Sequence, residues 1–105
     1  MMTLDEYQEQ AGKFQVPTSA AEERIFGLLS EAGEVAGVFQ KLIRGDYEFK
    51  EAGARLEKEL GDVLWYVSRI AADNNWTLSD IATTNLDKLE DRRIRNLIQG
   101  SGDNR

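Results

Sequence analysis

The chain has 105 residues, a length that predicts a single domain over residues 1–105. Its formal net charge is −6, from 19 acidic and 13 basic side chains, and this negative field disfavours nucleic acid as a partner. The sequence contains no cysteine and no histidine, which excludes disulfides, thiolate metal sites, cysteine nucleophiles and the commonest general base. Because no apolar run reaches the roughly 20 residues of a membrane span and the N-terminus lacks a signal-peptide pattern, we expect a cytoplasmic protein with no membrane partner.

The first predicted helix covers residues 4–14. Thr3 and Glu6 form a capping box, in which the threonine hydroxyl binds the backbone of the third helical residue and the glutamate binds back to the cap. Apolar side chains recur at helical spacing after this start. Pro17, the only proline, ends or offsets the element because its ring cannot continue a helix.

The second predicted helix covers about residues 20–43 and begins at another capping box, Ser19 to Glu22. Gly45 follows as its C-terminal cap, since glycine adopts the left-handed conformation that ends many helices. At about 100° per residue, Glu31 and Glu34 fall well away from the apolar stripe of this helix. The stripe consists of Ile25, Leu28, Leu29, Ala32, Ala36, Phe39 and Ile43.

Two further helices are predicted over about residues 51–74 and 78–97, the first after an ambiguous stretch at 47–53 that we interpret as a loop. Residues 98–105 form a polar, glycine-rich tail. No segment has the period of a strand, so we predict an all-α fold, a bundle of one short and three longer helices. The third helix carries a stripe of Leu56, Leu60, Val63, Leu64, Val67, Ile70 and Ala71.

Two acidic pairs stand out on consecutive helices: Glu31 with Glu34, and Glu59 with Asp62. Residues three apart share one face of a helix, and a short connection makes the two helices antiparallel neighbours. The four carboxylates then converge on one point, which is unfavourable unless a cation neutralises them. Oxygen ligands in this number suit Mg²⁺, with Mn²⁺ as a substitute.

A solvated helix face is the ordinary explanation of one such pair, because glutamate is a good helix former. Glycines interrupt both pairs here, at Gly33 and Gly61, and Gly27 and Gly37 lie nearby. A glycine inside a helix costs about 1 kcal/mol relative to alanine, so several of them indicate close helix approach or room for a ligand.

The acidic pairs and their surroundings resemble the signature of the MazG-like, all-α nucleoside triphosphate pyrophosphohydrolases. Glu31-x-x-Glu34 is followed after 24 intervening residues by Glu59-x-x-Asp62, which continues as Val63-Leu64-Trp65-Tyr66. Asn85 and Lys88-Leu89, with Arg92, are similar to a downstream segment of the family. The tail from Gly100 to Arg105 is similar to the endings of small members, so the resemblance spans the chain from Tyr7 onward.

This resemblance implies metal-dependent hydrolysis of a (deoxy)nucleoside triphosphate between the α and β phosphates, giving the monophosphate and pyrophosphate and clearing the nucleotide pool. It implies that Glu31, Glu34, Glu59 and Asp62 hold Mg²⁺, with Glu31 or Glu34 as the catalytic base. Such a reaction needs no covalent nucleophile, consistent with the missing cysteine and histidine.

Substrate contacts are expected from four further positions, one on the second predicted helix and three on the last. Lys41 lies two turns beyond Glu34 on the same face. It either contacts a phosphate or is an exposed lysine that the helix dipole favours near the helix C-terminus. The resemblance implies that Asn85 contacts the base or sugar and that Lys88 and Arg92 contact phosphate; solvated side chains are the alternative.

Among the aromatic residues, Trp65 is the best candidate for stacking on a base, because it follows the second acidic pair closely. Trp76, Tyr66 and Phe14 are expected in the core, where aromatic side chains are usually found.

We also expect a homo-oligomer, a dimer or tetramer. Four helices make a thin bundle, and Phe26, Val35 and Val38 are apolar residues outside the stripe that are available for a second copy. The resemblance implies oligomers with sites near interfaces.

Two alternative functions stay open. One is a superfamily relative with a dedicated substrate, dUTP, dCTP or phosphoribosyl-ATP, which shares the metal motif; the segment at 78–97 favours the broader activity. The other is a non-catalytic helical assembly module whose acidic residues only solvate its surface.

Overall fold

The computed structural model describes residues 1–96, 100 and 102–103, and these residues form four helices and no strand. The all-α fold is therefore confirmed. The predicted end of the fourth helix, at residue 97, and most of the tail fall outside the described residues. A bilayer-spanning segment is not found among the described helices, which are too short or too polar for one. The helices are α1 (Leu4–Gly12), α2 (Ala21–Arg44), α3 (Phe49–Asp73) and α4 (Leu78–Ile94).

Local sequence signals determine several helix ends. The Thr3 hydroxyl accepts a hydrogen bond from the Glu6 backbone N–H at 3.1 Å, which is one half of the predicted capping box. Thr77 and Asp80 form a reciprocal capping box at the start of α4. Gly45 has φ of 85°, so it ends α2 in the left-handed conformation that glycine adopts without strain.

Other predicted boundaries are wrong. The N-cap of α2 is Ala20, which has no side-chain cap, whereas the Ser19 hydroxyl accepts a hydrogen bond from Arg24 Nη1 at 2.7 Å. The first helix ends at Gly12 rather than 14, and the third begins at Phe49, so the loop before it is shorter than predicted.

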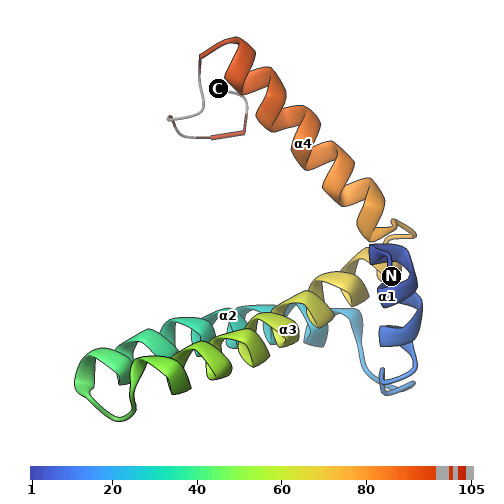
Figure 1. Ribbon diagram of the computed structural model, residues 1–105. Coiled ribbons are helices and arrows are strands. Elements are labelled where there is room, and N and C mark those ends of the chain that lie inside the picture. The colour runs from blue at the N-terminus through green and yellow to red at the C-terminus, as the bar shows by residue number, and fades with distance from the viewer. Residues whose placement is uncertain (97–99, 101, 104–105) are drawn as a thin grey trace.

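Helices α2 and α3 form a long antiparallel hairpin (Figure 1). At its open end, Arg24 forms a bidentate pair with Asp73, both contacts 2.6 Å long, and this guanidinium holds the pKa of Asp73 below its ordinary value. Next along the hairpin, the Tyr66 ring of α3 lies against Gly27 of α2. The register then brings Glu31 opposite the turn of α3 that carries Glu59.

The face of α2 that packs on α3 is not the apolar stripe expected from the sequence. Most of that stripe is exposed, with Leu29 at 71% and Ile43 at 87% of their full accessibility. Val38 is buried and Val35 half-buried instead, although both were expected on a surface for a second copy; Phe26 is exposed. The buried or half-buried residues of α2 are Arg24, Gly27, Leu28, Glu31, Val35, Gly37, Val38 and Leu42.

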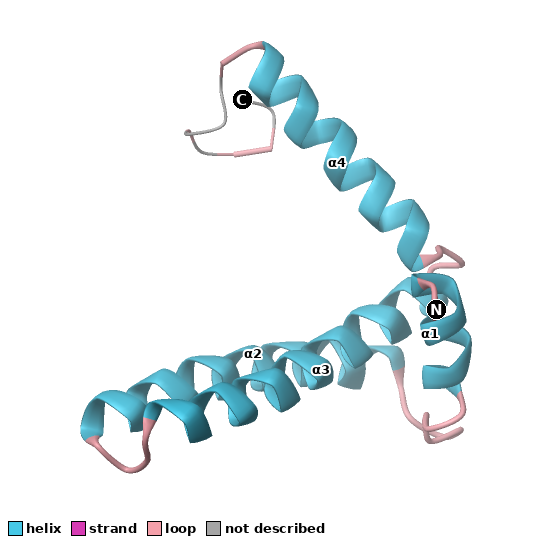
Figure 2. Cartoon of the chain, in the orientation of Figure 1, coloured by secondary structure: helices cyan, strands magenta, loops and turns pink. Residues whose placement is uncertain are grey.

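Helix α1 braces α3 and the start of α4. The Ala11 carbonyl accepts a hydrogen bond from Trp65 Nε1 at 3.0 Å. The Gln8 side chain donates to the Trp76 carbonyl at 2.9 Å and accepts from the Leu78 N–H at 2.6 Å. These bonds connect α1 to the turn from which α4 leaves the hairpin (Figure 2).

The resulting fold is open. Helix α4 contacts α1 and α3 and none of α2 within the described chain. The radius of gyration is 16.5 Å, against about 13 Å for a compact domain of 100 residues. The buried apolar side chains of the described residues are few and mostly small: Ala11, Val38, Ala52, Ala71 and Leu78.

The helix glycines have different environments. A Cβ added to Gly27 would overlap the Tyr66 ring, so this glycine permits close helix approach. Nothing lies within 4 Å of a Cβ added to Gly33, Gly37 or Gly61, so close packing within one chain does not explain those positions.

We predict that Gly27→Ala lowers the melting temperature, because displacing the Tyr66 ring costs about 1–3 kcal/mol and outweighs the helix propensity gained from alanine. Gly53→Ala in α3 is the matched control: its Cβ meets nothing within 4 Å, so it keeps a gain of about 1 kcal/mol and melts higher than wild type. Circular dichroism melting of the three proteins checks this. An equal rise for both variants would contradict the proposed close packing at Gly27.

Candidate functional site

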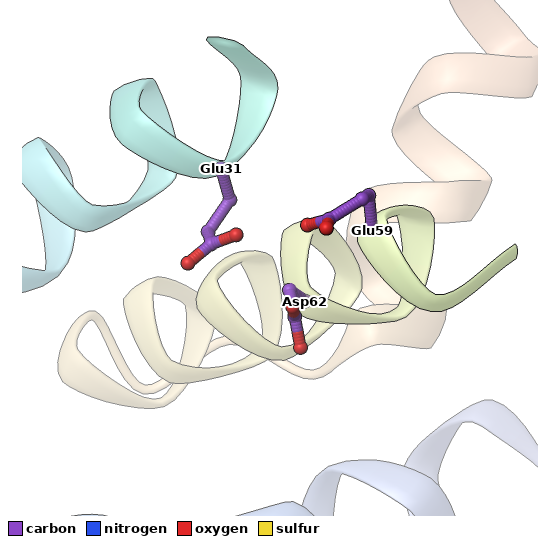
Figure 3. A group of neighbouring side chains, drawn as sticks. All are labelled: Glu31, Glu59 and Asp62. Atoms are coloured by element: carbon purple, nitrogen blue, oxygen red, sulfur yellow. The ribbon is translucent and has the colours of Figure 1, made fainter. Parts of the chain in front are cut away.

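Three carboxylates meet where α2 crosses the middle of α3. Glu31 projects from α2, and Glu59 and Asp62 project from positions three residues apart on α3 (Figure 3). One oxygen from each lies within 4.8 Å of the others. An oxygen-only donor set of this kind fits a hard divalent cation.

The electrostatics of the cluster are unfavourable for three separate negative charges. The pKa of the Glu31 carboxyl is raised, first by burial and then by the charges of Asp62, Glu59 and Glu34. Burial and like charges both disfavour the ionised carboxylate, so a cation at this position would relieve both.

Glu34, expected as a fourth ligand, is outside this group of three and is exposed. It lines a small cavity of about 30 Å³ together with Lys41 and Glu59. Lys41 and Glu34 therefore lie on the same side of α2, as expected. The cavity has room for about one water molecule.

Two residues of this cavity, Tyr47 and Arg55, were not anticipated from the sequence. Arg55 lies over the Tyr47 ring, 4.8 Å from its centroid, and pairs with Glu51 at 2.7 Å. The available signal was spacing, because Arg55 precedes Glu59 by four residues and so shares its helix face.

Tyr7 of α1 is a third residue that sequence reasoning did not select. Burial raises the pKa of its hydroxyl; Arg69 acts in the opposite direction, and the charge of Asp62 adds to the rise. Asp62 of the carboxylate cluster is therefore the smallest of the three influences on Tyr7. No spacing rule links positions 7 and 62, so only the packing of α1 on α3 reveals it.

The residues expected on α4 form a separate group. Asn85 and Lys88 line one cavity beside that helix. Lys88 Nζ contacts Asp103 Oδ1 at 3.1 Å, and the buried Arg92 contacts the same oxygen at 3.2 Å. Both contacts lower the pKa of Asp103. Because α4 makes no contact with α2, these cations and Glu31 are not brought together within one described chain.

Trp65 is half-buried and engaged in packing. Its N–H donates to Ala11, and its ring meets Tyr66 edge-to-face at 5.0 Å. It lines a cavity of about 180 Å³ with residues that include Phe14 and Arg24, away from the cavity of Asn85 and Lys88.

Comparison with known proteins identifies relatives. A family model described as the MazG nucleotide pyrophosphohydrolase domain matches residues 20–95. The gene 37 protein of Mycobacterium phage L5 is 44% identical over 81 residues, which cover 75% of this chain and 71% of the phage protein. No solved structure matches the chain.

We predict that Glu31→Gln raises the melting temperature at pH 7 in the presence of a chelator. An acid whose pKa is raised by folding destabilises the folded state once the pH exceeds that pKa, and the amide removes this cost. The difference should vanish below about pH 4, where the carboxyl is protonated in both states. Glu57→Gln, an exposed position of α3, is the control and should melt like wild type; a lower melting temperature for Glu31→Gln at pH 7 would contradict the prediction.

Proposed function

Because the chain belongs to the family of MazG nucleotide pyrophosphohydrolases, we propose that it hydrolyses (deoxy)nucleoside triphosphates between the α and β phosphates. The products are the nucleoside monophosphate and pyrophosphate, and we place the reaction in the cytoplasm, on the nucleotide pool. The observation that carries the proposal is the convergence of Glu31, Glu59 and Asp62, with oxygens within 4.8 Å of one another.

The proposed cofactor is Mg²⁺, with Mn²⁺ as a substitute. The donor set supports it, since all three groups are carboxylates and the negative charges of Asp62 and Glu59 add to the effect of burial in raising the pKa of Glu31. When bound, such an ion neutralises phosphate charge and lowers the pKa of a water molecule.

The protein side chains divide the remaining work. Glu34 lies outside the group of three, so we assign its carboxylate the role of accepting the proton of the attacking water. The water oxygen forms a bond to the α phosphorus while the bond from that phosphorus to the bridging oxygen breaks. Lys41 and Arg55, on the same cavity as Glu34, offset the negative charge of the departing pyrophosphate.

We further propose that the active form is a homo-oligomer, a dimer or tetramer. In one chain, Lys88 and Arg92 lie on a helix that makes no contact with α2, so the phosphate-binding cations and Glu31 need a second copy to meet. The exposed stripe of α2 is a suitable surface for such a copy, since a row of apolar side chains this long is rarely left in water. It comprises Ile25, Leu29, Ala32, Ala36, Phe39 and Ile43.

The reaction is tested by measuring pyrophosphate release from a panel of dNTPs and NTPs, with Mg²⁺ or with EDTA. We expect metal-dependent release of pyrophosphate and monophosphate in equal amounts. Glu59→Gln should lower kcat/KM by at least about 100-fold, because it removes a carboxylate of the cluster. Glu57→Gln should leave the rate unchanged.

Three outcomes separate the alternatives. Turnover of a single nucleotide in the panel would favour the relative with a dedicated substrate. Release of orthophosphate would reject cleavage between the α and β phosphates. No turnover of any nucleotide, with no effect of Mg²⁺ on the melting temperature, would leave the non-catalytic helical module.

The composite site makes a separate prediction for mixed oligomers. Glu59→Gln and Lys88→Ala should each be nearly inactive alone. Co-expressed, they should recover part of the wild-type activity, because some mixed oligomers then hold one site with both groups intact. If the two groups act within one chain, the mixture stays as inactive as its components.

A further inference from the structure

A cavity of about 350 Å³ runs along one face of α4. Its lining residues recur three or four positions apart, so they share that face. The end nearest the α3–α4 turn has the large apolar side chains Trp76 and Ile81, together with the Asp80 carboxylate, which accepts the Thr77 N–H at the start of α4. The far end is polar, with Asn85 and Lys88. Apolar walls with a few convergent polar groups are typical of small-molecule sites.

Trp76 is held at this cavity by its backbone. Asn75 before it has φ of 59°, in the left-handed region, and the Trp76 N–H donates to the Ala71 carbonyl at 2.9 Å. The Trp76 carbonyl accepts from Gln8 at 2.9 Å. The residue nevertheless stays 53% exposed, so a large aromatic ring is positioned beside the cavity without being packed into the core.

Trp65 has the opposite arrangement. Its indole N–H donates to the Ala11 carbonyl and its ring lies nearly perpendicular to that of Tyr66, so it joins α1 to α3. It also lies on a different cavity from Asn85 and Lys88. A base that stacks on Trp65 is therefore out of place for a nucleotide held by those two residues of the same chain.

We propose that Trp76, rather than Trp65, is the platform on which the nucleotide base stacks when Asn85 and Lys88 hold the nucleotide. The inference rests on the proposed function, and it gives the nucleotide a direction along α4, from the base at Trp76 to the phosphates at Lys88. Charge supports this direction, because the Lys88 ammonium and the Arg92 guanidinium already contact one anionic oxygen, that of Asp103. Stacking on an aromatic face accepts every base, which suits a broad substrate range.

Fluorescence tests the platform without requiring turnover. Trp65→Phe leaves Trp76 as the only indole of the chain. We expect an α,β-methylene nucleoside triphosphate to quench this fluorescence, and inorganic tripolyphosphate to leave it unchanged. In the complementary variant Trp76→Phe, the nucleotide should leave the Trp65 signal unchanged. Quenching confined to Trp76→Phe would overturn the inference and assign the base to Trp65.

Affinity gives a second measurement. Calorimetry should show Trp76→Ala weakening binding of the analogue about tenfold or more, with tripolyphosphate affinity within about twofold of wild type. Phe49→Ala removes another exposed aromatic ring and is the matched control, which should bind like wild type. The inference would be overturned if Trp76→Ala binds the nucleotide as tightly as the wild type does. It would also be overturned if the variant differs from the wild type only in the mass of its oligomer.

The two proposals fail separately. If the wild type hydrolyses nucleotides and Trp76→Ala has the same KM as the wild type, the base platform is contradicted and the proposed reaction is not. Quenching of Trp76 by the analogue without any hydrolysis of nucleotides supports the platform and contradicts the reaction.

Discussion

The candidate site depends on placing carboxylates inside a contact between two helices. Glu31 lies on the face of α2 that packs against α3, so pairing the helices necessarily brings it to Glu59 and Asp62. Burial and mutual repulsion raise the pKa of Glu31, and this energy cost is the physical reason to expect a cation there. The contacts on either side keep the register: Tyr66 against Gly27, and the Tyr47 hydroxyl donating to the Val38 carbonyl at 2.8 Å.

The second constraint is the direction of α4. Gln8 bonds on both sides of the turn before α4, and the Asp5 carboxylate accepts from the Ser79 N–H at 3.1 Å. These bonds direct α4 away from the hairpin and leave apolar surface on α2 exposed (Figure 1). The short helix α1 therefore determines how far the phosphate-binding residues proposed on α4 lie from the carboxylates of their own chain.

Sequence patterns failed where one helix has two apolar faces. Helix α2 carries a long stripe from Ile25 to Ile43 and a second row with Val35 and Val38, which meets the stripe at Leu28. Periodicity identifies both but does not say which one meets α3. The stripe with more apolar residues was expected to pack and is exposed, whereas the row that contains Glu31 lies at the contact. The sequence likewise does not say which of the two tryptophans is exposed. In the structure Trp65 is half-buried and Trp76 is exposed.

The sequence alone determined the all-α class, the caps at Thr3 and Gly45, the spacing of the acidic pairs and, through their surroundings, the family. These depend on local rules: capping chemistry, the conformational freedom of glycine and a 3.6-residue period. Tertiary structure decided which carboxylates converge, that Glu34 is outside the group, and that Arg55 shares a cavity with Glu59. Those outcomes depend on the register and rotation of one helix against another. Contacts between residues that are distant in the sequence determine both.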